Sequence, residues 1–228
     1  MKTFKKITLT ILSIVLVCLC TGGCEKKANS GIDGIDVSNH QGAVNWKKAA
    51  ECLSENSFVY IKCTEGATYT DRNYKKNADG AKKQGILVGG YHYFRMTSSA
   101  HKQFENFKKA LNSINLDLIP MVDVETSDGK PKKELQDSLY VFLNLLEKEY
   151  GKKPMIYGTQ RSYNTYCAPK FNTYPLYIGR YGNNAPMISG PSHYTIWQYS
   201  EAGRISGIQK PVDLCRFHKR KSINDILL

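Results

Sequence analysis

The sequence predicts an α/β protein in which eight strands close into an irregular β/α barrel. Short apolar runs rich in β-branched residues alternate with amphipathic helical stretches, a pattern typical of a parallel sheet covered by helices. Eight candidate strands favour closure into a barrel over an open sheet. An open, doubly wound sheet is the alternative, but no glycine-rich phosphate-binding loop supports it.

The first five expected strands are separated by helices, and the last three are separated by loops. The helices are expected over residues 46–53, 73–84, 100–111 and 132–150. Their apolar residues recur at three- and four-residue spacing, which gives each helix one face for packing. The expected strands are residues 34–38, 58–63, 86–94, 118–125, 154–157, 175–178, 194–199 and 212–214.

The N-terminal segment has the features of an export signal and is not expected to join the fold. Its lysines precede an apolar stretch at 7–20 that is too short to span a membrane comfortably. Small residues directly before Cys24 resemble a bacterial lipoprotein signal, in which Cys24 becomes the lipid-bearing first residue. The alternative is an ordinary secretory signal cleaved nearby. We therefore expect a signal peptide at 1–23, a polar tether at 24–31 and one barrel domain at 32–228.

The exported chain is basic. Removing Lys2, Lys5 and Lys6 from the 32 basic residues leaves 29 against 20 acidic residues. This balance suits an anionic partner such as the cell wall or a membrane surface. No nucleic-acid motif is present, and the lysines are scattered over helical stretches, so we expect no nucleic-acid partner.

Two carboxylates end the expected strand at 118–125. Asp123 and Glu125 are two residues apart, so in a strand both side chains project from the same face. Like charges held close raise the pKa of one member, which suits acid/base chemistry. The alternative is an ordinary strand end whose acids face water.

Further acids and aromatic residues fall at the ends of other strands. Asp36 ends the first expected strand and Asp213 lies in the last, and these strands are neighbours in a closed barrel. Carboxylates ringed by aromatic side chains suit a carbohydrate cleft, because sugar CH faces stack on aromatic rings. The candidate binding residues are Tyr91, Phe94, Tyr157 and Trp197.

Seven sequence motifs follow one another along the chain. They are GIDVS with HQG and Trp46, IKCTEG at 61–66, VGGYHYF at 88–94, MVDVE at 121–125, PMIY at 154–157, YTIWQY at 194–199 and VDL at 212–214. In this order they resemble glycoside hydrolase family 25, the Chalaropsis-type lysozymes. The resemblance covers nearly all of residues 32–217, although Asn39-His40 replaces the more usual His-Trp and Cys215-Arg216 departs from the usual Asn-containing ending.

The resemblance implies a lysozyme that hydrolyses, with retention, the β-1,4 bond between N-acetylmuramic acid and N-acetylglucosamine in peptidoglycan. Glu125 would be the proton donor, and Asp123 would either orient the substrate N-acetyl group or act as nucleophile. Asp36 and Asp213 would complete the acidic floor. The resemblance implies no metal and no cofactor, and we expect a monomer at the membrane surface of the cell envelope, anchored through Cys24.

Two other functions remain open from the sequence. One is a non-catalytic glycan-binding barrel, although such proteins usually lose the acid and here all four acids are present. The other is a metal-dependent deacetylase of cell-wall glycans, which would need a His/Asp ligand set that five scattered histidines do not obviously supply. For Cys52, Cys63, Cys167 and Cys215, we expect buried thiols or at most one disulfide.

Overall fold

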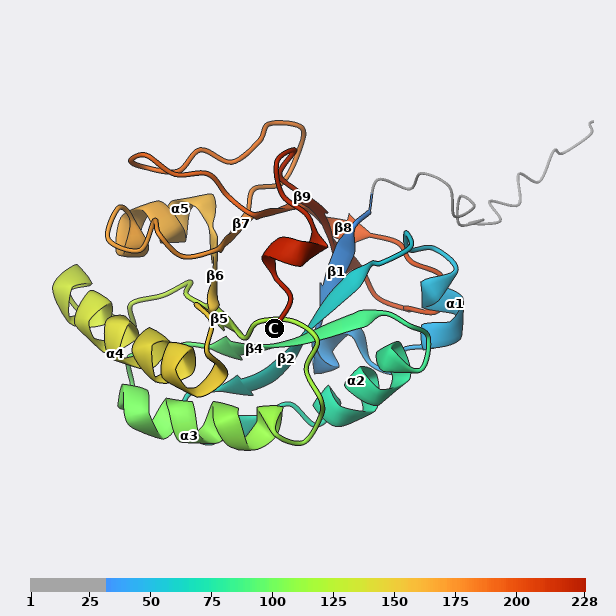
Figure 1. Ribbon diagram of the computed structural model, residues 1–228, viewed down its shortest axis with the longest axis horizontal. Coiled ribbons are helices and arrows are strands. Elements are labelled where there is room, and N and C mark those ends of the chain that lie inside the picture. Colours follow the sequence, from blue (N-terminus) through green and yellow to red (C-terminus); the bar gives the residue numbers. More distant parts are fainter. Residues whose placement is uncertain (1–31) are drawn as a thin grey trace, which may run out of the picture.

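A computed structural model describes residues 32–228 of the chain. The expected signal peptide, the tether and Cys24 lie outside the described residues. The described part is a closed barrel of eight strands with helices packed on its outside (Figure 1). The expected fold class is therefore confirmed.

The barrel closes because β1 pairs with β2 as well as with β9. Around the barrel the order is β1, β9, β8, β7, β6, β5, β4 and β2, and the two-residue strand β3 (Tyr69–Thr70) extends β2 as a hairpin. The eight barrel strands are β1 (Gly34–Val37), β2 (Phe58–Glu65), β4 (Leu87–Tyr93), β5 (Met121–Asp123), β6 (Met155–Thr159), β7 (Leu176–Gly179), β8 (Ile196–Gly203) and β9 (Val212–Phe217).

The last strand, β9, departs from the expected parallel sheet. It runs antiparallel to both of its neighbours, whereas the other seven strands of the barrel are parallel. A short loop at 204–211 joins β8 to β9, and such a connection can return the chain only in the opposite direction, because a parallel pair needs a crossover. As a result Asp213, near the start of β9, pairs with Asp36 near the end of β1.

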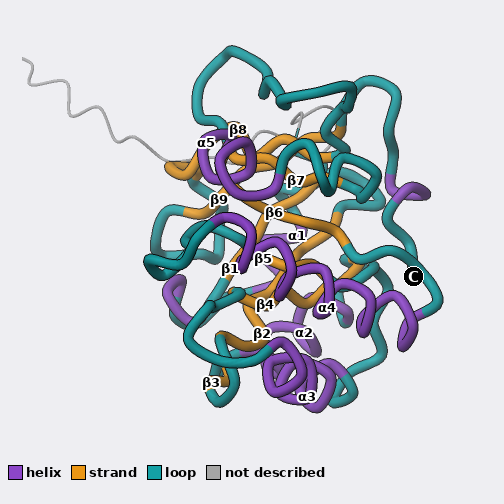
Figure 2. Tube along the Cα trace, turned by 90° about the vertical axis from the view of Figure 1, so that its left-hand side faces the viewer, coloured by secondary structure: helices purple, strands orange, loops and turns teal. Residues whose placement is uncertain are grey.

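Helices cover the side of the barrel built by the first half of the chain, and loops cover much of the rest (Figures 1 and 2). Helix α5 runs directly into a π-helical turn at Tyr163–Cys167. No helix within residues 32–228 is long and apolar enough to span a membrane. The α-helices are α1 (Trp46–Ala50), α2 (Tyr74–Lys82), α3 (Ala100–Leu111), α4 (Lys132–Tyr150) and α5 (Gln160–Ser162).

Two buried layers follow from the alternation of side chains along the strands. One layer fills the barrel and includes Tyr60, Met121 and Tyr177, and the other lies between the barrel and its helices. Burial at this scale is the main term that stabilises the fold. Three of the expected buried thiols, those of Cys63, Cys167 and Cys215, are buried and free.

The C-terminal segment closes the amino end of the barrel. Ile226 is fully buried among the residues that fill the barrel, and its carbonyl oxygen accepts a hydrogen bond from the Ile119 backbone N–H at 2.9 Å. Leu227 bridges to Leu118, just before β5. Because this end is filled with apolar side chains, the polar side chains of the barrel interior collect at the opposite, carboxyl end.

Candidate active site

A cavity of about 350 Å³ opens at the carboxyl end of the barrel strands. All four acids expected from the sequence line it, together with the expected aromatic residues Tyr91 and Tyr157. The other lining residues were not among the expected site residues. They are Ser38, His40, Lys62, Tyr93, Met121, Tyr181, Gln198 and Glu201.

Strand β5 and the extended residues directly after it direct Asp123 and Glu125 into this cavity from the same face. The residue between them, Val124, is fully buried with the outer core layer, as strand alternation requires. Its backbone N–H donates to the carbonyl of Tyr157 at 2.9 Å, which ties this stretch to the neighbouring strand β6. The two carboxylates are therefore held on rigid backbone at the mouth of the barrel.

Asp36 is the most heavily hydrogen-bonded acid of the cavity. Its Oδ2 accepts from the Tyr177 hydroxyl at 2.7 Å and from Gln198 Nε2 at 2.9 Å, and the Cys215 Sγ lies 3.7 Å away. These donors come from three different strands, β7, β8 and β9. The carboxyl of Asp213 also shares a hydrogen bond with Asp36.

Burial and the mutual repulsion of two carboxylates favour a proton shared by Asp36 and Asp213. Burial raises the pKa of both carboxyls, and for Asp213 the neighbouring charge of Asp36 and the hydrogen bond to it raise the pKa further. Hydrogen bonds from Tyr177 and Gln198 favour the ionised form of Asp36. We therefore place the shared proton on Asp213, which donates it toward Asp36.

Asp123 is buried with an unused acceptor. Burial, followed by the charge of Glu125, raises its pKa well above the ordinary value, while Lys62 opposes the shift. Its Oδ1 has no hydrogen-bond partner among the described residues, although it is inaccessible to solvent. A buried carboxyl oxygen without a partner is costly, so the position suits a carboxyl that a bound donor completes.

Glu125 lies just beyond the end of β5 and is only partly buried. Burial raises its pKa, and the charge of Asp36 adds to the rise. A hydrogen bond from Tyr93 and the charge of Lys62 act in the opposite direction. A carboxyl with a raised pKa at a cavity mouth keeps its proton to higher pH than an exposed carboxyl and can give it up to a bound group.

Lys62 is the cation of the cavity, and an ion pair holds it at the rim. Its Nζ lies 2.8 Å from Glu65 Oε2, and it sits 5.0 Å from the centre of the Tyr93 ring. Arg95 reaches the same Glu65 carboxylate at 2.9 Å. The Lys62–Glu65 ion pair therefore places one positive charge beside the acids.

The structure separates the four expected aromatic residues into two groups. Tyr91 and Tyr157 face the cavity, and the Tyr157 hydroxyl donates to Gln198 Oε1 at 2.9 Å. Phe94 is fully buried outside the barrel, 5.4 Å from Phe142 of α4 between ring centres. It lies outside the cavity because it directly follows Tyr93, and adjacent strand positions face opposite sides.

Trp197 also faces the outside of the barrel. It sits between Ile196 and Gln198, whose side chains point inward. Its indole N–H donates to the Arg180 carbonyl at 2.6 Å, and the Arg216 guanidinium lies 4.2 Å from the ring centre. The side chain is 5 % exposed, so its contacts are those of a packed residue and not of an open stacking platform.

His92 also faces the outside of the barrel, because it lies between two residues whose side chains face inward. Its ring is therefore separated from the acids of the cavity. It lies between Tyr91 and Tyr93, is fully buried and packs against Phe107 and Phe142. Burial lowers its pKa to about 4, so the ring is neutral at physiological pH. Within residues 32–228 no group of three or more His, Cys, Asp or Glu side chains could hold a metal ion. The described residues therefore offer no ligand set for the deacetylase alternative.

Sequence reasoning missed the polar residues that organise the acids, above all Tyr177 and Gln198. Both face the barrel interior, because side chains alternate along a strand, and their strands otherwise consist mostly of apolar residues. The sequence did contain one indication, since Gln198 directly follows Trp197. Neighbouring residues of a strand face opposite sides, so only one of these two side chains can face the cavity. Tyr181 lies in a loop after β7, where spacing predicts no direction.

The sequence profile described as Glycosyl hydrolases family 25 matches residues 35–208. The Escherichia coli K12 protein YegX is 34% identical over 194 residues, which are 84% of this chain and 71% of YegX. Lysozyme M1 of Streptomyces globisporus is 31% identical over 204 residues, 83% of this chain and 68% of the relative. A family 25 glycosyl hydrolase structure from Bacillus anthracis has a TM-score of 0.74 and 32% identity, and the match covers 82% of this chain and 88% of that one.

The outward position of Trp197 gives a prediction. Trp197→Ala should lower the free energy of unfolding by about 3–5 kcal/mol, because a large buried side chain is removed. Urea denaturation measures the change, and Tyr181→Ala serves as the comparison because Tyr181 lines the cavity and is 46% exposed. Unchanged stability of Trp197→Ala together with weakened glycan binding would instead make Trp197 a binding residue.

Proposed function

Since the chain belongs to glycosyl hydrolases family 25, we propose that its acidic cavity cleaves the β-1,4 bond between N-acetylmuramic acid and N-acetylglucosamine in peptidoglycan, with retention. The chain is a glycoside hydrolase. A relative named as a lysozyme is 31% identical to it, and the structure of a family 25 glycosyl hydrolase has the same fold. The observation that carries the proposal is the gathering of Asp36, Asp123, Glu125 and Asp213 in one cavity at the carboxyl end of the barrel.

In this proposal Glu125 is the general acid. Its raised pKa lets it hold a proton when substrate binds, and its position at the cavity mouth leaves it open to a glycosidic oxygen. Proton transfer to that oxygen accompanies cleavage of the bond to the anomeric carbon. The ionised Glu125 then takes a proton from the water that completes hydrolysis, which regenerates the acid.

Asp123 has two roles open to it, and both use its unpartnered Oδ1. This oxygen can accept the N–H of the substrate N-acetyl group, so that the acetyl oxygen is oriented toward the anomeric carbon. Alternatively, Asp123 itself attacks the anomeric carbon. Either route uses two displacements and so retains the configuration.

Asp36 and Asp213 support the two reacting carboxyls without needing to touch the anomeric carbon. The shared proton keeps the pair at one negative charge, which faces the positive charge that develops on the sugar ring. Asp36 also raises the pKa of Glu125 and Asp123. The Tyr177 and Gln198 donors fix the orientation of Asp36 and thereby the direction of its field.

We further propose that the protein is exported and held at the membrane surface of the cell envelope by a lipid on Cys24. The support is the lysine-rich, apolar N-terminal segment with small residues before Cys24. Cys24→Ala should then move the protein from the membrane fraction to the soluble fraction. Retention of the variant in the membrane fraction would show that another feature anchors the chain.

Digestion of purified peptidoglycan tests the enzymatic function. The protein is incubated with sacculi and the released muropeptides are analysed by mass spectrometry, with the expectation of new reducing ends at muramic acid. Tight binding to sacculi without product would support the non-catalytic glycan-binding alternative. Reducing ends at glucosamine would assign cleavage to the other β-1,4 bond of the glycan.

Glu125→Gln should lower the rate of muropeptide release by about 10²–10⁴-fold, because the amide keeps the shape but has no proton to transfer. The high-pH limb of the rate profile should disappear in the same variant. Glu134→Gln is the matched control, since Glu134 lies exposed on α4. Near-full activity of Glu125→Gln would remove Glu125 from the role of proton donor.

Glu125→Gln should also change the dependence of stability on pH. The folded state raises the pKa of Glu125 above its ordinary value of 4.5, so the folded protein keeps a proton that the unfolded chain releases. The free energy of unfolding of the wild type therefore falls as pH rises above that value. The variant should gain stability relative to the wild type as the pH rises above 4.5. Urea denaturation at several pH values measures the difference, and a difference independent of pH would contradict the assigned shift.

A further inference from the structure

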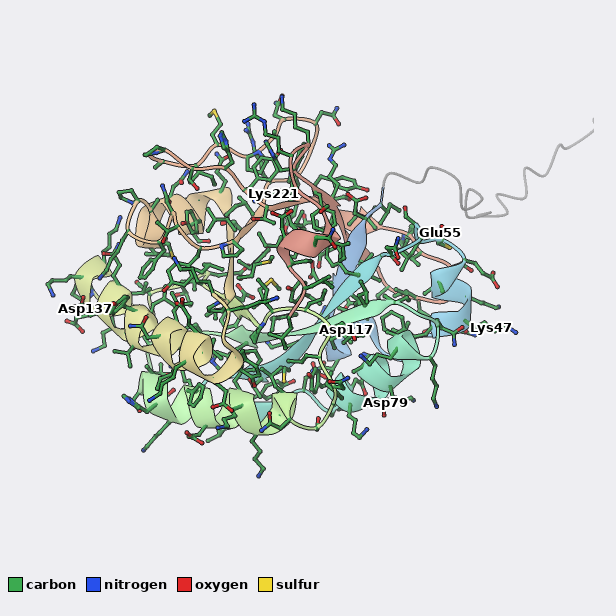
Figure 3. The ribbon with its side chains drawn as sticks, in the orientation of Figure 1. Lys47, Glu55, Asp79, Asp117, Asp137 and Lys221 are labelled. Carbon is green, nitrogen blue, oxygen red and sulfur yellow. The ribbon has the colours of Figure 1, made fainter. Side chains whose placement is uncertain are left out.

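A second cavity, of about 1150 Å³, lies outside the barrel, between α1, α2 and the loop that joins β8 to β9. We call it the basic groove because its lining carries six cations and a single carboxylate, Asp79. Figure 3 shows Lys47 of α1 and Asp79 of α2 on the same side of the molecule. The six cations are Lys47, Lys48, Arg72, Lys75, Lys76 and Lys83.

The floor of the basic groove is tightly packed. The Trp46 ring lies against Gly80 of α2 so closely that a Cβ at Gly80 would collide with it. At one edge, the Asn45 backbone N–H donates to the Gly207 carbonyl at 2.8 Å, and this bond ties the β8–β9 loop to the start of α1. The groove is therefore formed by packed elements and is not a gap between loose loops.

Asn77 gives this floor an unused hydrogen-bond donor. Its Oδ1 accepts from the Trp46 indole N–H at 3.4 Å, so the amide nitrogen is left for another partner. Asn77 lines the groove and is 3% exposed. Its Nδ2 is buried and has no hydrogen-bond partner within the described chain. A buried N–H group without an acceptor is costly, which suits an oxygen supplied from outside.

The cations of the groove are largely uncommitted. Among the residues that the structure describes, only Lys75 of the six forms an ion pair, with Asp79 at 2.8 Å. The catalytic cavity has the opposite character, since five carboxyls and one lysine line it. An anionic ligand is therefore attracted to the basic groove and repelled by the catalytic cavity.

We propose that the basic groove binds a linear polymer with phosphodiester groups that is carried by the cell wall. A concave groove admits a chain, whereas a flat bilayer surface would reach only its rims. Lys76 and Lys83 are seven residues apart along α2 and its end, about 10.5 Å of helical rise, so the cations can meet successive charges of one chain. Five of the six cations are lysines, whose compact charges bind phosphate groups without a fixed orientation, as a flexible phosphodiester chain requires.

This inference does not depend on the proposed catalytic function, because binding is measured with a soluble polymer that is not a substrate. A synthetic glycerol phosphate oligomer is titrated into the full chain by calorimetry at several salt concentrations. Lys47, Lys76 and Lys83 are replaced together by Gln, and the matched control replaces Lys130, Lys148 and Lys219, which are equally exposed and lie elsewhere.

The groove variant should bind the oligomer at least ~10-fold more weakly at low salt and show a smaller salt dependence, whereas the control should bind like the wild type. The side-chain amide resonance of Asn77 should shift when the oligomer binds to the wild type. Absence of binding, or equal loss in both triple variants, would overturn the proposal. So would equal binding of an oligogalacturonate, or groove-dependent binding to phosphatidylglycerol vesicles without binding to the oligomer.

Discussion

The carboxyl end of this barrel depends on one buried carboxylate, that of Asp36. Removing a charge from water is costly, and the protein offsets the cost with donors from Tyr177, Gln198 and Cys215 on three successive strands. Each donor can reach Asp36 only if the barrel is closed through β1 and β9. Closure of the barrel therefore also supplies the donors that stabilise the Asp36 carboxylate.

The antiparallel direction of β9 determines which acid lies beside Asp36 and how much charge the two acids add to the cavity. It brings Asp213 opposite Asp36, so that two carboxyls share one proton, and the pair adds one negative charge to the cavity and not two. A second full charge would raise the pKa of Glu125 and Asp123 further, and would favour protonated acids throughout the cavity. The pair thus keeps a negative field at the site, beside the partly buried Glu125.

Sequence reasoning found the barrel, the order of its strands along the chain and the four acids, because strand periodicity and acids at strand ends are local patterns. It placed Phe94 and Trp197 at the cavity, although parity relative to Tyr93 and Gln198 turns both outward. The direction of β9 and the proton shared by Asp36 and Asp213 could not be read from spacing. They depend on pairing between residues about 180 positions apart, which only the closed barrel brings together.

Charge is divided between two faces of the same barrel. The acidic cavity suits a sugar chain on which positive charge develops, but the same carboxylates repel an anionic wall at longer range. The lysines of α1 and α2 lie on the outer surface, where they can attract such a wall without reaching the acids. If cations lined the cavity itself, they would lower the pKa of Glu125, as Lys62 already does in part, and less of it would keep the proton that a general acid must donate. Because the cations lie on the outer helices and not in the cavity, electrostatic attraction and acid catalysis can coexist in one small domain.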